Sequence, residues 1–323
     1  MRPVDAPKTV VTRQSSAVRR SLQRVTETAP PLCAVVSRQR EEPLTATASR
    51  VERWLLVEHR GAWGPESVPS SRMSRPVARA IAEHAATAGA RLLLVRRPGR
   101  HTPAEGRWIY AVDSRPGVER VLGRHLADDT ELLDLVAPFD DADASGWSPV
   151  DGPLYLVCTH GRNDRCCAVR GRPVAHALAA AHPDRVWECS HVGGDRFAAN
   201  VVVLPEGLYL GRVEPEDAVE VVAALADGML PAGLVRGRSS LPLPTQAAQQ
   251  FAREATGRWG VLDLAPVQQE SAGPDAWRVV LADDLVVVVA YERHGDGTAH
   301  VLSCGDPAKT TPSFRLVSLE PAG

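Results

Sequence analysis

Four of the chain's six cysteines lie within residues 158–189, and two of them, Cys166 and Cys167, are adjacent. A small secreted scaffold would have cysteines along its whole length, whereas the other two here, Cys33 and Cys304, lie far from the group. Clustered cysteines in a reducing compartment are typical of metal ligands or redox thiols. The sequence therefore predicts a thiol-based metal or redox site, with Cys33 and Cys304 as structural or bystander thiols.

The loop VCTHGRNDRCC, residues 157–167, contains three cysteines but no C-x-x-C pair, which disfavours a dithiol oxidoreductase. A longer loop between two cysteines can wrap a cluster at a strand-to-helix turn when a second pair of ligands follows. The segment SHVGGDRFAANV, residues 190–201, offers such a pair in His191 and Asp195. The two glycines between them permit a tight backbone around a bulky ligand.

The elements that must position these residues follow a recognisable order. Residues 154–158 predict a strand, residues 172–182 a helix and RVWECS a second strand; a hairpin turning at residues 205–207 and a closing helix in EPEDAVEVVAALADG follow. This β-α-β-β-α order is that of the thioredoxin fold. The first half also alternates strand and helix, which predicts α/β layering and, on order of elements alone, a degenerate copy of the same unit.

The remaining segments complete a predicted α/β organisation in four parts. Residues 1–30 are expected to be a disordered leader, 31–145 an N-terminal α/β domain, and 150–235 a thioredoxin-like domain that carries the site. Residues 240–323 are expected to form a small α+β appendage. Its predicted elements are a helix in LPTQAAQQFAREATG and antiparallel strands in WRVVLADDLVVVVAYER and TAHVLSCG.

Composition excludes several classes of protein. The 323 residues carry a formal net charge of -2 and no concentrated basic tract, so there is no electrostatic case for a nucleic-acid partner. The most apolar run, LADDLVVVVAY, is too short to span a membrane, and the N-terminal segment lacks the apolar core of a secretion signal. We therefore expect a cytoplasmic protein.

Three segments, CTHGRNDRCC, SHVGGDRFAANVVV and LYLGRVEPED, resemble the sucrase/ferredoxin-like family of thioredoxin-like 2Fe-2S proteins. The family pattern is roughly C-T-H-G-x-R-D-x-x-C followed by S-H-x-G-G-H-x-F-A-x-N. The match is specific across residues 154–217. Support in the first half is weaker and comes from PLCAVVSRQREEPLTATASR, HRGAWG and LLLVRRPGRH.

The resemblance implies a set of cluster ligands. Two cysteines and two histidines hold the cluster in that family, which carries over to Cys158, Cys167 and His191 and leaves Asp195 in place of the second histidine. The aligned register selects Cys167, with Cys166 as its alternate. Cys189 is a substitute for the fourth ligand or a buried small hydrophobe, because it should share a face with His191.

The leading hypothesis is a redox carrier, rather than a stand-alone enzyme, with one 2Fe-2S cluster that passes electrons between an unknown reductase and an unknown acceptor. Zinc bound by the same residues is one alternative, and a cluster-free thiol protein using Cys166 and Cys167 is another. The arginines of the loop, Arg162, Arg165 and Arg170, form either a solvated face or a docking patch for an acidic partner. Glycoside hydrolysis is discounted because no pair of carboxylates is singled out by spacing.

Overall fold

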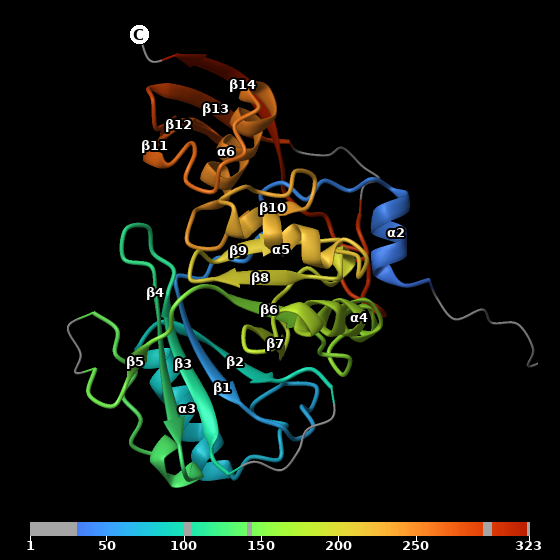
Figure 1. Cartoon of the computed structure of the whole chain (residues 1–323). Coiled ribbons are helices and arrows are strands. Elements are labelled where there is room, and N and C mark those ends of the chain that lie inside the picture. The colour runs from blue at the N-terminus through green and yellow to red at the C-terminus, as the bar shows by residue number, and fades with distance from the viewer. Residues whose placement is uncertain (1–30, 100–104, 141–143, 293–298, 322–323) are drawn as a thin grey trace, which may run out of the picture. The chain divides into compact units, whose positions relative to one another are not determined.

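A mixed sheet of ten strands runs through most of the described chain, in the order β10-β9-β8-β6-β7-β2-β1-β3-β4-β5 (Figure 1). The computed structural model describes residues 31–99, 105–140, 144–292 and 299–321, so the leader predicted at 1–30 lies outside it. The strands are β1 (Arg53–Glu58), β2 (Ala90–Arg96), β3 (Arg107–Asp113), β4 (Arg120–Leu126), β5 (Ser148–Pro149), β6 (Leu154–Cys158), β7 (Val186–Cys189), β8 (Val201–Leu204), β9 (Leu208–Leu210) and β10 (Val235–Arg238).

The two halves of this sheet have the same topology. In the second half, β6 leads through helix α4 (Arg165–Ala181) into the parallel strand β7, and the hairpin β8–β9 then adds antiparallel to β6 before helix α5 (Ala218–Ala226). In the first half, β1, helix α3 (Arg75–Thr87), β2 and the hairpin β3–β4 are connected and paired in the same way.

The chain is thus an α/β protein with a thioredoxin-like unit preceded by a degenerate copy, as the sequence predicts. The copy is degenerate because a single 3-10 turn, η1 (Asp129–Leu132), follows its hairpin where the second half has α5. The two units meet through antiparallel pairing of β2 with β7, in which Val95 lies opposite Cys189. The domain boundaries predicted from the sequence stay a prediction.

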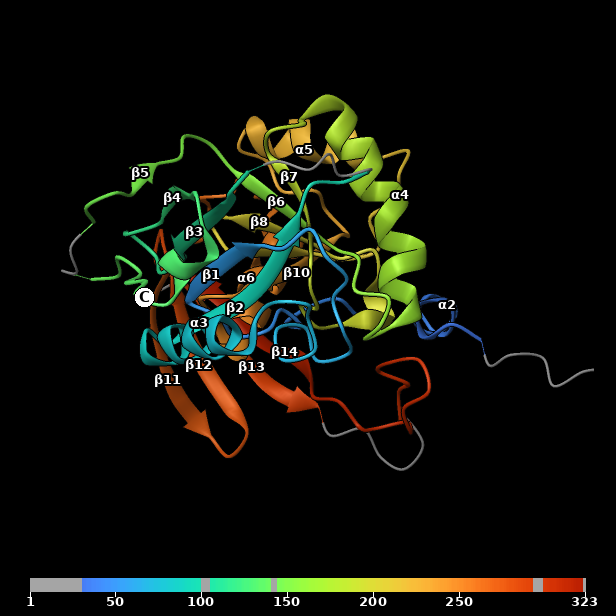
Figure 2. The ribbon, with the colours of Figure 1, turned by 90° about the horizontal axis from the view of Figure 1, so that it is seen from below.

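Helices α3, α4 and α5 cover one face of the ten-stranded sheet, and the other face forms a core common to both halves. Figure 2 shows α3 beside β2, and α4 beside β6 and β7. Side chains of α5 pack with those of α4, β6 and β8 in one apolar core. Alternation along β6 sends Leu156 and Cys158 into the common core, while Tyr155 and Val157 pack beneath α4 and α5. Cys158 therefore ends its strand at the edge of the core that joins the two units.

The C-terminal part is helix α6 (Leu243–Thr256) packed on an antiparallel sheet of β11 (Pro266–Gly273), β12 (Ala276–Leu281), β13 (Leu285–Glu292) and β14 (Ser313–Pro321). The predicted antiparallel appendage is confirmed, but the strand predicted in TAHVLSCG is wrong. Of its described residues, His300 makes an isolated bridge to Lys309, and β14 begins at Ser313. Within the described residues, every helix is too short or too polar to cross a bilayer.

Candidate metal centre

Cys158, Cys167 and His191 come together at one end of the second thioredoxin-like unit. Cys158 is the last residue of β6, Cys167 lies in the first turn of α4, and His191 is the second residue after β7. Because β6 and β7 are parallel, their carboxyl ends meet beside the N-terminus of the helix that connects them. The two sulfurs and an imidazole nitrogen lie within 4.8 Å of one another.

Asp195 approaches this group from the short 3-10 helix η2 (Asp195–Phe197). Its Oδ1 accepts a hydrogen bond of 3.1 Å from the Cys167 thiol and lies 3.0 Å from Nδ1 of His191. Its Oδ2 accepts a hydrogen bond of 2.7 Å from the Ser303 hydroxyl. Asp195 is therefore a buried carboxylate in contact with two members of the group. It is not itself within 4.8 Å of all three of the other ligand atoms.

The two alternate residues predicted from the sequence lie in different places. Cys189 is fully buried opposite Cys158 in the β6–β7 register, and its thiol interacts with that of Cys158. Cys166 faces away from the group, with its Sγ 3.4 Å from the sulfurs of both Cys33 and Cys304. Cys189 thus adjoins the first group, whereas Cys166 belongs to a second one.

The close packing of these groups changes their pKa values. Interactions with the Cys167 and Cys189 thiols, together with the His191 imidazole, hold the pKa of Cys158 well below its usual range. The same interaction with Cys158, burial and the Asp195 carboxylate raise the pKa of Cys167. Burial lowers the pKa of His191, but Asp195 and Cys158 outweigh burial and raise it to about 10. The metal-free site therefore favours a thiolate beside an imidazolium.

The backbone of the His191 loop is fixed by side chains from several parts of the chain. The carbonyls of all four residues 191–194 accept side-chain hydrogen bonds of 2.8 to 3.2 Å. The donors are Arg91 to His191, Ser49 and Tyr209 to Val192, Arg236 to Gly193, and Asn200 to Gly194. Because Arg91 lies on β2 and Ser49 precedes β1, the first half of the chain takes a direct part in positioning the loop.

Arg236 places a fully buried guanidinium beneath this loop, which the sequence analysis missed. It donates 2.8 Å to Asn200 Oδ1 and also binds Thr47, and its guanidinium lies 5.3 Å from the ring centre of Phe197. Burial lowers its pKa to about 10. A Cβ on Gly194 would lie 2.3 Å from an Arg236 nitrogen, so the glycine makes room for the cation. No local sequence pattern marks this residue, because its partners are distant in the chain.

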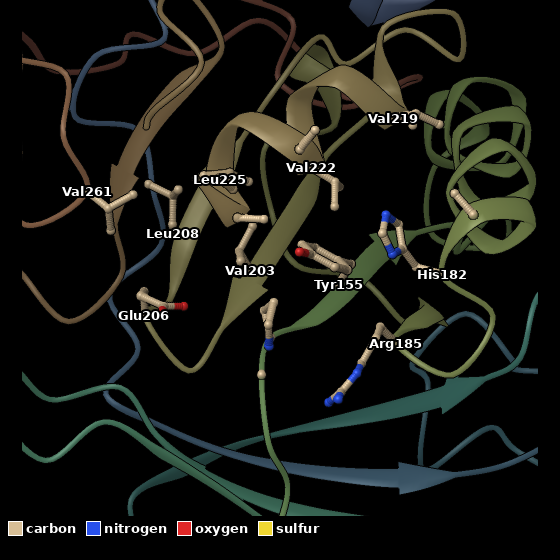
Figure 3. Close-up of a pocket in the computed structure, with 15 residues that line it drawn as sticks. Tyr155, His182, Arg185, Val203, Glu206, Leu208, Val219, Val222, Leu225 and Val261 are labelled. Carbon is tan, nitrogen blue, oxygen red and sulfur yellow. The ribbon is translucent and has the colours of Figure 1, made fainter. Parts of the chain in front are cut away.

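A separate apolar cavity of about 680 Å³ lies on the helix-covered face of the same unit. Figure 3 shows Tyr155, Val203 and Val222 lining it, with His182 and Glu206 among the polar groups. Tyr155 and Cys158 face opposite sides of β6, and no cysteine is among the residues that line the cavity. The cavity is thus distinct from the cysteine site.

Comparison with solved structures finds the thioredoxin-like [2Fe-2S] ferredoxin from Aquifex aeolicus. One structure is 24% identical, with a TM-score of 0.25, and covers 29% of this chain and 97% of the ferredoxin. A second structure, of the wild type, is 24% identical, with a TM-score of 0.23, and covers 27% of this chain and 97% of the ferredoxin. Comparison with curated proteins finds none that matches.

The family comparison covers both thioredoxin-like units. Residues 44–237, more than half of the chain, match the model of the sucrase/ferredoxin-like family. The matched range begins before β1 and ends within β10, so it contains the first-half residues that bind the His191 loop as well as the cysteine-histidine group. The chain therefore belongs to the sucrase/ferredoxin-like family.

Proposed function

We propose that this protein carries single electrons on a 2Fe-2S cluster held by Cys158, Cys167, His191 and Asp195. The observation that supports the proposal is the convergence of two buried thiols and an imidazole at the carboxyl ends of β6 and β7. Two thiolates and two harder ligands form a donor set related to that of Rieske centres, in which two histidines replace two cysteines on one iron.

The residues present fit such a group. Nδ1 of His191 lies 3.0 Å from Asp195 Oδ1 and forms an ion pair with that carboxylate while the imidazole is protonated. Loss of the proton leaves a ring nitrogen free to bind a metal beside the two thiols. The thiols of Cys158 and Cys167 supply the soft ligands that iron-sulfur clusters require. The cluster, when bound, stores one electron in its iron atoms.

The chain's own residues then have separate tasks. Cys158 and Cys167 are almost wholly shielded from solvent, which excludes water from that side of the site. The His191 side chain is 29% exposed, so the path to a partner protein runs through its imidazole. Asp195 contributes a negative charge, and the buried guanidinium of Arg236 donates to the Gly193 carbonyl of the same loop.

The partners in this proposal are a reductase and an acceptor protein. Arg162 and Arg165 are exposed on the loop that precedes and begins α4, and Arg170 is half-buried within 3.7 Å of Glu214. Arg162 and Arg165 are therefore the arginines available to an acidic partner, and attraction of that kind acts mainly on the rate of encounter.

Iron and sulfide analysis of anaerobically purified protein tests the proposal. We expect about two irons and two sulfides per chain, visible charge-transfer absorption, and an EPR signal that appears on reduction. Protein that stays colourless after reconstitution with iron and sulfide under anaerobic conditions would contradict it. Zinc that is lost on Cys158→Ser substitution would instead assign this site to zinc, which two cysteines, a histidine and a carboxylate can also hold.

A redox role for a Cys166–Cys167 disulfide has less support. The Cys167 thiol donates to Asp195, whereas the Cys166 sulfur contacts Cys33 and Cys304. The two neighbouring thiols therefore have different partners, and a bond between adjacent cysteines would itself be strained.

A further inference from the structure

A second group of sulfurs lies beside the first. Cys33 begins helix α2 (Cys33–Gln39), Cys166 lies in the first turn of α4, and Cys304 lies in the segment that precedes β14. Their sulfurs are 3.4 Å apart for Cys33 and Cys166, 3.4 Å for Cys166 and Cys304, and 3.6 Å for Cys304 and Cys33. Oδ2 of Asp164 lies 3.9 Å from the Cys33 sulfur.

These distances fit one metal ion better than a cluster. A tetrahedral ion with bonds of about 2.3 Å to sulfur places its sulfur ligands about 3.8 Å apart. The three sulfurs here are already at nearly that separation, and the carboxylate oxygen is at a similar distance from one of them. Sulfurs bound to different irons of a cluster lie farther apart, because the irons and bridging sulfides separate them.

We propose that Cys33, Asp164, Cys166 and Cys304 bind one zinc ion, in a site separate from that of the proposed iron-sulfur cluster. Three thiolates and a carboxylate complete a closed tetrahedral shell, which is the arrangement of structural rather than catalytic zinc. Soft thiolate ligands select zinc over the hard cations magnesium and calcium. Binding displaces the three thiol protons to solvent and leaves the carboxylate oxygen as the fourth donor.

Backbone amides around the group are arranged to support bound thiolates. The amide of Cys33 donates to the Cys304 sulfur at 3.4 Å, and that of Ala34 donates to the Cys166 sulfur at 3.5 Å. Asp164 is oriented by the amide of Cys166, 2.7 Å from Oδ1, and by the amide of Cys304. Hydrogen bonds of this kind fix the ligands and offset the negative charge of three thiolates and a carboxylate.

The zinc ion would tie together parts of the chain that are far apart in sequence. Cys33 and Cys304 are 271 positions apart. The sulfurs of both lie 3.4 Å from that of Cys166, on the helix that also carries Cys167. Ser303, next to Cys304, donates the hydrogen bond to Asp195. The zinc site therefore holds in place the segment that orients the carboxylate of the first site.

Metal analysis of the full chain, expressed with both iron and zinc in the medium, tests the proposal. We expect one zinc per chain in the wild type and a loss of most of it in both Cys33→Ser and Cys304→Ser. Cys158→Ser is the matched control, since it should keep the zinc while losing any iron-dependent colour. Zinc content unchanged in both of the first two variants, or zinc lost only with Cys158→Ser, would overturn the assignment.

Cobalt supplies a readout that does not depend on the iron site. In the Cys158→Ser background, Co²⁺ added to metal-free protein should give tetrahedral d–d bands and sulfur-to-cobalt absorption at one equivalent. Cys304→Ser should weaken the sulfur bands by about a third, since it removes one of three thiolates, and its partly exposed position makes misfolding a smaller concern than at Cys33. A mononuclear iron in place of zinc, or a disulfide among the three cysteines in anaerobically purified protein, would overturn the proposal.

Discussion

Cys166 and Cys167 are neighbours in the sequence, but their sulfurs belong to two different groups. The Cys167 thiol lies with Cys158 and His191, while the Cys166 sulfur lies between Cys33 and Cys304. Successive residues of a helix point about 100° apart, so the first turn of α4 can serve two sites at once. The two groups thus share one turn of α4, and a substitution at either cysteine removes a sulfur from only one of them.

Cys167→Ser should therefore abolish retention of the cluster, whereas Cys166→Ser should leave it in place. The serine oxygen is a poor ligand for iron, and only Cys167 contacts the other members of the first group. Visible absorption and iron content of the two purified variants provide the comparison. The reverse result, with colour lost in Cys166→Ser and kept in Cys167→Ser, would show that the ligand register is displaced by one residue.

Asp195→His should raise the reduction potential, on the order of 100 mV, because it replaces a carboxylate ligand by a neutral imidazole and removes a negative charge from the cluster. It should also add a second ionisation to the pH dependence of the potential, since a second imidazole is present. Redox titration across pH, with EPR of the reduced state, measures both effects. Cys189→Ala is the companion variant: if it alone changes the g-values, Cys189 is the fourth ligand.

The grouping of Cys158, Cys167 and His191 could be predicted from sequence because its signals are local. The loop of residues 157–167 and the His191-to-Asp195 segment each follow a buried strand of one β-α-β unit, so the topology brings them together. The resemblance to a known family added the ligand register. Whether Asp195 completes the ligand set is a question of side-chain geometry, which sequence does not contain.

The second group of sulfurs could not be predicted from sequence, because its members are far apart in the chain. Cys33 begins a helix of seven residues, and Cys304 lies in a segment that the sequence predicts to be a strand. Neither cysteine is part of a recognisable sequence motif. Their approach to Cys166 depends on long-range packing, in which residues 32–34 and 301–304 meet beside the first turn of α4. The role of Arg236 could not be predicted for the same reason. A buried cation is identified by its hydrogen-bond acceptors, and those of Arg236 are 36 to 189 positions away in the sequence.

Arg91→Ala should shorten the lifetime of the cluster without removing any ligand. Arg91 donates a hydrogen bond of 2.9 Å to the carbonyl of His191, and its loss leaves that carbonyl unpaired, at a cost of about 1–3 kcal/mol. The rate at which a chelator bleaches the visible absorption should rise several-fold. Arg79→Ala is the control, since Arg79 is exposed on α3 and its ion pair is with Glu83 of the same helix. Equal bleaching rates in the two variants would show that the hydrogen bond from Arg91 does not help to retain the cluster.

The metal-free protein should become less stable as pH rises from about 6.5 to about 10, because of His191. Although burial lowers its pKa, Asp195 and Cys158 raise it to about 10 in the folded state, against about 6.5 for an unfolded histidine. A folded pKa above the unfolded one gives stabilisation that is complete below about pH 6.5 and lost as pH rises through about 10.

Asp195→Asn removes the main group that raises the pKa of His191. The fall in the free energy of unfolding between pH 6 and pH 9.5 should therefore be smaller in this variant, by on the order of 2 kcal/mol. Urea unfolding of metal-free protein under reducing conditions gives the free energies at each pH. Cysteine thiols of the unfolded chain also titrate in this interval, so the informative quantity is the difference in the free energy of unfolding between wild type and variant. Glutamine at position 191 cannot titrate, so in a His191→Gln background the Asp195→Asn substitution should no longer change the pH dependence. Parallel pH profiles for wild type and Asp195→Asn would show that the carboxylate does not hold the proton on His191.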